Sequence, residues 1–147
     1  MRVVVQRVLN ASCTIDGKLY SEIEKGYLLL VGFTHSDSLK EVKYLAKKIA
    51  NLRVFEDENG KMNLSLKTVN GKILSISQFT LYADTKDGNR PAFINAMKPH
   101  EASKLYDLFN EELRGYDIEV LTGVFGADMK INLVNDGPVT IIYDEIL

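Results

Sequence analysis

The chain has 147 residues, of which 46% are hydrophobic and 26% are charged, and its formal net charge is −2. These values predict a single soluble domain over residues 1–147 and exclude a protein that coats nucleic acid with a strongly basic face. Cys13 is the single cysteine, so an internal disulfide is impossible. The longest apolar run, residues 27–33, is too short to span a membrane, and no signal-peptide pattern is present. We therefore expect a cytoplasmic protein that does not associate with membranes.

The first third of the chain predicts strands at residues 2–9, 12–15, 18–23 and 27–33. Asp16 and Gly17 are a typical hairpin turn between the second and third of them. Arg7 falls on the apolar face of the first strand. A guanidinium there needs carboxylate or carbonyl partners, unless the side chain reaches solvent at the strand end.

Two helices are predicted, one in each half of the chain. Ser38 and Glu41 have the spacing of a capping box, and apolar residues follow at helical spacing to about Asn51. Pro99 suits the first turn of a second helix that runs through residues 101–114 and ends at a glycine. Short strands are predicted between the helices at residues 53–56 and 62–66.

A long strand is predicted over residues 72–84, after an Asn-Gly turn at 70–71. Its end is polar on both faces, at Ser77, Gln78 and Thr80. Either this strand carries a functional site at its end, or these side chains meet solvent where the sheet is no longer covered. Periodicity alone favours the second interpretation.

The C-terminal third predicts strands at residues 116–124, 129–134 and 139–143. A turn with the sequence Asn-Asp-Gly-Pro, residues 135–138, separates the last two. Pro138 fixes φ and lacks an N–H donor, whereas Gly137 is free to adopt unusual φ values. The pair predicts a locally stiff backbone of unusual shape.

The common catalytic and cofactor motifs are missing from the sequence. His35 and His100 have no motif around them, and no His/Cys cluster has the spacing of metal ligands. No glycine-rich phosphate loop or nucleophile elbow is present. Thr80 would be a nucleophile only with a base nearby, which the sequence does not supply. An enzyme of this sequence would work without a metal or cofactor, through backbone donors, positioning and a group on the substrate.

Two motifs make the chain resemble the D-aminoacyl-tRNA deacylase family: Ser-Gln-Phe-Thr-Leu at residues 77–81 and Asn-Asp-Gly-Pro-Val-Thr at 135–140. The resemblance covers essentially the full length, and further matching segments are residues 1–8, 55–57, 61–65 and 122–129. One departure is Ala92, where the family pattern leads us to expect serine.

The resemblance implies an α+β fold with a mostly antiparallel, barrel-like sheet and two main helices. It also implies a homodimer with cross-subunit active sites that binds the aminoacylated 3′ end of tRNA and hydrolyses the ester to a D-amino acid. Gly137 and Pro138 would form a cis pair inserted into the partner's site. Their rigid carbonyls would exclude every L side chain by clash, and glycyl-tRNA would be cleaved as a side activity.

The resemblance also implies roles for individual residues. The ester would lie beside Ser77, Gln78, Phe79 and Thr80, with the Phe79 N–H and Thr80 near the developing oxyanion. Gln78 would hold the terminal adenosine or the aminoacyl group, and the tRNA 2′-hydroxyl would help to activate water. Arg7 would brace the Gly-Pro turn, and Met129 would support the site.

Two other functions remain open at this stage. A noncatalytic module that binds RNA ends or nucleotides would also explain the polar strand end and the missing triad. An esterase with Thr80 as nucleophile would act on small esters through a covalent acyl-enzyme.

Overall fold

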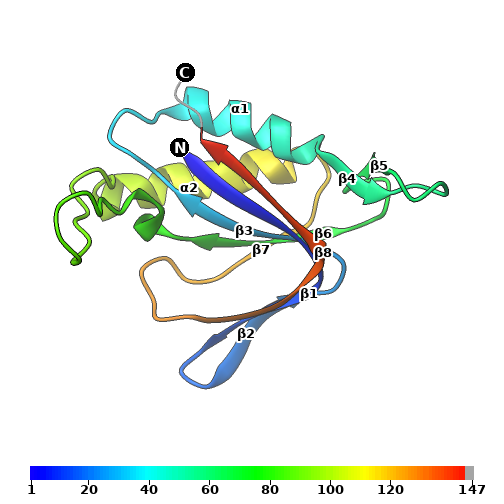
Figure 1. Ribbon diagram of the computed structural model, residues 1–147, viewed down its shortest axis with the longest axis horizontal. Helices are drawn as coiled ribbons and strands as arrows, with labels where there is room; N and C mark the ends of the chain where they lie inside the picture. Colours follow the sequence, from blue (N-terminus) through cyan, green and yellow to red (C-terminus); the bar gives the residue numbers. More distant parts are fainter. Residues whose placement is uncertain (145–147) are drawn as a thin grey trace.

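The computed structural model describes residues 1–144, which form one strongly curved sheet with two helices against it (Figure 1). The strands of the sheet are β1 (Arg2–Ile15), β2 (Lys18–Ile23), β3 (Gly26–Gly32), β6 (Lys72–Ser77), β7 (Val120–Thr122) and β8 (Lys130–Asp144). Their order is β2-β1-β3-β6-β7, with β8 paired to β1. β1 is antiparallel to β2, β3 and β8, whereas β3, β6 and β7 run parallel.

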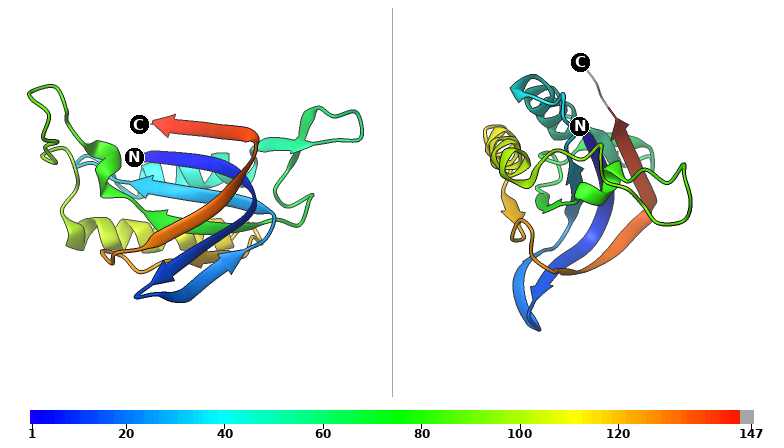
Figure 2. Two further views of the ribbon diagram at one scale, coloured as in Figure 1. Left: turned by 60° about the horizontal axis from the view of Figure 1, so that its bottom comes forward. Right: turned by 90° about the vertical axis from the view of Figure 1, so that its left-hand side faces the viewer.

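The length of β1 and β8 gives the sheet its barrel-like curvature (Figure 2). The first half of β1 pairs with β3, the second half pairs with β2, and β8 follows β1 along its other edge. The predicted interruption of the first strand near Asn10 is wrong, because pairing with β8 continues through Asn10. Asp16 and Gly17 form the predicted hairpin turn, both with positive φ.

The two helices cover one face of the sheet (Figures 1 and 2). α1 (Leu39–Ala50) starts at the predicted capping box, and α2 (Pro99–Arg114) starts at the predicted proline. Between helices and sheet lies the main core, which includes Val3, Tyr27, Leu29, Leu45, Ile49, Ile73 and Phe109. A smaller apolar cluster, with Cys13, Leu28, Leu74 and Ile76, fills the concave face. No helix within residues 1–144 is long and apolar enough to cross a membrane.

The predicted strand over residues 72–84 ends early, at Ser77. Its alternation holds up to that point, since Ile73 packs under the helices and Leu74 on the concave face. The Gln78 N–H donates to the Val31 carbonyl at 2.7 Å, and the chain then turns into a 3₁₀ helix, η1 (Phe79–Tyr82). β3 ends at Gly32, so no neighbouring strand remains for residues beyond Gln78 to pair with.

The C-terminal strands also differ from the prediction. The predicted strand at 116–124 shrinks to β7, and the predicted strands at 129–134 and 139–143 are one strand, β8, interrupted by a bulge. Gln6 of β1 pairs with Thr140 of β8, and Val8 pairs with Asn135. An advance of two residues along β1 therefore corresponds to five residues along β8. We call residues 136–139 the Gly-Pro bulge. β4 (Arg53–Glu56) and β5 (Met62–Ser65) form a separate hairpin, as predicted.

Candidate active site

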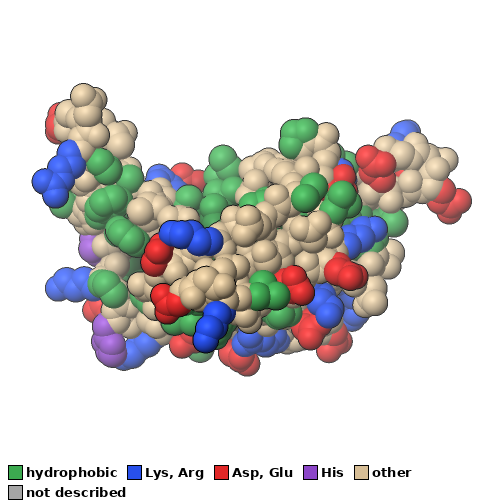
Figure 3. Space-filling model, turned by 90° about the horizontal axis from the view of Figure 1, so that it is seen from below, with side chains coloured by type: hydrophobic (Ala, Val, Ile, Leu, Met, Phe, Trp, Pro, Cys, Tyr) green, Lys and Arg blue, Asp and Glu red, His purple; other side chains and the backbone are tan. Residues whose placement is uncertain are grey.

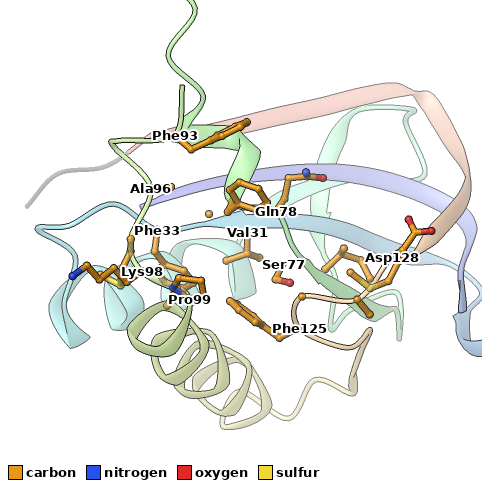
Figure 4. A pocket seen from close by; sticks show the side chains of 18 of the residues that line it. Val31, Phe33, Ser77, Gln78, Phe93, Ala96, Lys98, Pro99, Phe125 and Asp128 are labelled. Carbon is orange, nitrogen blue, oxygen red and sulfur yellow. The ribbon is translucent and has the colours of Figure 1, made fainter. Parts of the chain in front are cut away.

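A cavity of about 580 Å³ opens where β3 and β6 end beside the first turn of α2 (Figure 4). This volume lies within the usual range for ligand sites. Ser77, Gln78, Phe79 and Met129, all expected in the site, line it, whereas Thr80, on η1, is not among the lining residues. The walls also include Val31, Phe33, Phe93, Ala96, Lys98, Pro99, Phe125 and Asp128.

The start of η1 provides backbone donors beside this cavity. The first N–H groups of a helix have no partner within it, and among residues 1–144 neither the Phe79 nor the Thr80 N–H has a backbone or side-chain acceptor. The Thr80 hydroxyl is hydrogen-bonded to the Gln78 side-chain amide. An amide does not accept a proton at neutral pH, so this contact positions the hydroxyl and does not activate it.

The floor of the cavity is apolar and closely packed. Met129 comes so near to Gly123 that a Cβ at position 123 would clash with the Met129 sulfur. The same Cβ would lie 3.3 Å from the Cys13 sulfur. Burial raises the pKa of the Cys13 thiol, which therefore stays protonated and behaves as a packing side chain.

The outer wall, residues 92–97, was not recognised from sequence as part of the site. Phe93 meets Phe79 edge to face, with ring centroids 4.9 Å apart, and Phe79 is 56% exposed. The Thr34 hydroxyl donates to the Asn95 carbonyl at 2.6 Å, and His35 Nε2 lies 2.6 Å from the Ile94 carbonyl. An aromatic residue inside a polar loop was the one available signal, and the loop's folded position depends on contacts with distant residues.

The Gly-Pro bulge lies at the opposite end of the sheet and is held by Arg7. The peptide bond between Gly137 and Pro138 is cis, and both residues are exposed. Arg7 is 5% exposed; its Nε donates to the Asp136 carbonyl at 3.0 Å and its Nη1 to the Val54 carbonyl at 2.6 Å. Of the two interpretations of Arg7, the structure therefore supports the one with carbonyl partners.

The bulge and the cavity are separate within one chain. Ser77 is level with Val31 and Val3, whereas the bulge is level with Arg7, four residues further along β1. They are also three strands apart, from β8 through β1 and β3 to β6. At about 3.3 Å per residue and about 4.8 Å between strands, this separation is about 20 Å along the sheet. The cavity-lining residues do not include Gly137 or Pro138.

No three His, Cys, Asp or Glu side chains in the described part of the chain are grouped so that they could hold a metal ion. Lys98 is the cation of the cavity wall and Asp128 its carboxylate; Asp128 pairs with Lys130 at 3.0 Å. The remaining polar groups of the cavity are the Ser77 hydroxyl, the Gln78 amide and backbone groups.

Comparison with known proteins gives a consistent result. The family model described as D-Tyr-tRNA(Tyr) deacylase matches residues 4–144. D-aminoacyl-tRNA deacylases from Fusobacterium nucleatum and Lactobacillus gasseri are 60% and 58% identical over 144 residues, which cover 98% of this chain and 95% and 99% of those proteins.

Two solved structures share the fold. A c-Myc DNA unwinding element binding protein is 41% identical, with a TM-score of 0.93 over 100% of both chains. A probable eukaryotic D-amino acid tRNA deacylase is 16% identical, with a TM-score of 0.85 over 98% of both chains, and at that identity the likeness concerns the fold alone. Together with the match over residues 4–144, the identity to the curated relatives shows that the chain belongs to the D-Tyr-tRNA(Tyr) deacylase family.

Proposed function

We propose that this protein hydrolyses the ester between a D-amino acid and the 3′ end of tRNA and spares L-aminoacyl esters. The observation that carries the proposal is the strand end at residues 77–80. In a chain of this family, Ser77, Gln78 and Phe79 line a cavity of ligand size, and the Phe79 and Thr80 N–H groups have no acceptor among residues 1–144. The curated relatives are named for the same activity.

The chemistry follows from these donors. Water adds to the ester carbonyl carbon, and the oxyanion that forms accepts hydrogen bonds from the Phe79 N–H and from Thr80. The 2′-hydroxyl of the terminal ribose takes part in removing the proton from water. The bond to the ribose oxygen then breaks, and that oxygen takes up the proton lost by the attacking water. The products are tRNA with a free hydroxyl and the D-amino acid, which ionises to its carboxylate. Gln78 and Ser77 hold the terminal adenosine and the aminoacyl group, and Met129 supports the floor.

Selection against L-amino acids is assigned to the Gly-Pro bulge of a second copy of the chain. Main-chain carbonyls of Gly137 and Pro138, placed where an L side chain would project, exclude all L residues whatever their chemistry. The separation of about 20 Å within one chain supports contribution by a partner, since one chain alone does not bring bulge and cavity together. Glycine has no side chain to clash, so glycyl-tRNA is also a substrate.

A role for Thr80 as nucleophile has less support. The group bonded to its hydroxyl is the Gln78 amide, and no His, Asp, Glu or Lys side chain of residues 1–144 is within hydrogen-bond distance of it. Covalent catalysis by threonine needs such a base. Thr80 therefore acts by position, beside the oxyanion.

The test is release of tyrosine from D-tyrosyl-tRNA and L-tyrosyl-tRNA by the purified protein. We expect rapid loss of the D ester, loss of the L ester at the rate seen without protein, and no covalent acyl-protein in quenched single turnovers. Equal loss of both esters would contradict the chiral role. Binding of the D ester without hydrolysis would instead establish a noncatalytic RNA-end module.

A further inference from the structure

A second cavity, of about 380 Å³, lies next to the first at the same end of the molecule. It is lined by Arg2, Thr34, Tyr82, Ala83, Asp84, Thr85, Lys86, Asn95 and Asp144. The two cavities share two walls. Phe79 of η1 lines the first and Tyr82 the second, and in the 92–97 loop Phe93 and Ala96 line the first and Asn95 the second. Histidine side chains lie at the left-hand end of the molecule in Figure 3, whereas Lys and Arg side chains are spread over the face shown.

The cations of the second cavity differ in what they are free to bind. Arg2 donates from Nη1 to the Leu81 carbonyl at 2.8 Å, pairs with Asp144 at 3.1 Å, and lies over the Tyr82 ring at 4.5 Å from its centroid. One face of the guanidinium is thus fixed on an aromatic ring, and the opposite face is a flat platform for a base. Lys86 has no carboxylate of residues 1–144 within ion-pair distance. Its ammonium is available for a phosphate.

The polar edge of the second cavity combines the Asp84 carboxylate, a hydrogen-bond acceptor, with the Asn95 side-chain amide. Asp84 is held in place by backbone pairing with Ala92 and by its side chain, which accepts from the Lys86 N–H at 3.0 Å. Asn95 is held through its backbone carbonyl by Thr34. Two cations and two carboxylates line the site, so their formal charges cancel. This balance suits a neutral base with one phosphodiester better than a polyphosphate.

We propose that the second cavity binds the nucleotide that precedes the terminal adenosine, which in tRNA is a cytidine. The inference rests on the proposed function, because it assumes that the terminal adenosine occupies the first cavity. Lys86 meets the phosphodiester between the two nucleotides, and the base stacks on Arg2. The Asp84 carboxylate accepts from the cytosine amino group, and the Asn95 amide meets the remaining base edge, which offers acceptors.

The experiment compares two small substrates, the 3′-D-tyrosyl esters of adenosine and of cytidylyl-(3′→5′)-adenosine. We expect kcat/KM to be at least about tenfold higher for the dinucleotide ester, mainly because its KM is lower. A tenfold ratio corresponds to about 1.4 kcal/mol for the added contacts. Lys86→Ala and Asn95→Ala should each reduce this advantage several-fold. The matched control is Lys43→Ala, which removes an exposed lysine that lines neither cavity.

Equal kcat/KM for the two esters, or an advantage that both variants leave intact, would overturn the proposal. Failure of the proposed function itself looks different, because then neither D-tyrosyl ester is hydrolysed above the rate without protein. Replacing the cytidine by uridine gives a further measurement, since uracil lacks the amino group that Asp84 accepts from. We expect a several-fold lower kcat/KM for the uridine substrate, and equal values would overturn the assignment of the base contact.

Discussion

Gly137 is a residue of the Gly-Pro bulge that has little freedom to change. Its φ is +131°, a region that side chains rarely adopt. A Cβ there would lie 2.8 Å from Val139 Cγ2 and 3.0 Å from Arg7 Nη2. Since Arg7 also holds the Asp136 carbonyl, a side chain at position 137 would disturb the brace of the bulge as well as the bulge.

Gly137→Ala is therefore expected to lower the free energy of unfolding by about 1–3 kcal/mol and to reduce the preference for D over L esters. The measurements are urea unfolding and initial rates on D- and L-tyrosyl-tRNA. Gly60→Ala is the matched control, because Gly60 also has positive φ, +73°, but a Cβ there meets nothing within 4 Å. Unchanged chiral preference in Gly137→Ala would contradict the role of the bulge.

At the scale of single residues, the kind of contact that a side chain needs could be predicted from sequence, but the residues that provide that contact could not. The cost of a guanidinium on an apolar strand face indicated that Arg7 needs acceptors, and the Asp136 and Val54 carbonyls are those acceptors. They lie 129 and 47 residues away in the chain, so no local pattern identifies them. The same holds for Phe93, which reaches Phe79 through the folding of a loop.

Among the elements, η1 is the one to which the proposed function assigns the oxyanion donors. If the Phe79 N–H stabilises the oxyanion, removing that N–H should slow hydrolysis more than removing the ring. Phe79→Pro lacks the N–H and suits the first position of a helix, while Gln78 before it is already extended, at φ −145° and ψ 82°. Phe79→Ala keeps the N–H and removes the ring, so it is the matched control.

We expect kcat for D-tyrosyl-tRNA to fall by about 100-fold or more in Phe79→Pro relative to Phe79→Ala. Circular dichroism and thermal unfolding of both variants establish that they fold. Equal kcat in the two folded variants would show that the Phe79 N–H is not an oxyanion donor.

Helices were predicted better than strands because their signals are local. Ser38 and Glu41 mark the start of α1, and Pro99 marks the start of α2. Strand ends depend on neighbours that are distant in sequence. β6 ends at Ser77 because β3 has no further residues to pair with, and β8 continues through a Pro-containing bulge because β1 lies beside it on both sides of the interruption.

On the scale of the whole molecule, buried tyrosines predict a loss of stability at alkaline pH. Burial raises the pKa of Tyr27, Tyr82 and Tyr106 above the usual value of 10.0, and Tyr106 donates to the Ser75 carbonyl at 2.7 Å in a buried contact. A folded-state pKa above the unfolded value contributes stability that is complete below pH 10 and is lost as pH rises towards the folded-state pKa.

The free energy of unfolding should therefore decrease as pH rises above about 10, the ordinary pKa of tyrosine. Urea unfolding at pH 8 to 11 measures it. Tyr106→Phe should make the decrease shallower, whereas Tyr44→Phe, at an exposed tyrosine of α1, should not. A slope that Tyr106→Phe leaves unaltered would contradict the contribution of the buried hydroxyl.

The fold holds the two family motifs far apart on one chain, a separation that no local sequence pattern predicts. Ser77 to Thr80 lie at one end of the sheet, and Gly137 and Pro138 lie three strands away at the other. The proposed site therefore requires a second copy of the chain, with the bulge of one chain facing the cavity of the other. Exposure of the bulge and of Phe79 in the single chain is consistent with that requirement.

The most direct measurement is complementation between two variants, each inactive alone. Phe79→Pro removes the proposed donor, and Gly137→Leu fills the partner's cavity with a side chain. In a shared site, a mixed dimer has one site with both changes and one with neither. Refolding equal amounts together should therefore restore about a quarter of the wild-type rate on D-tyrosyl-tRNA. If the mixture is no faster than the two separate variants, the site is not shared between chains.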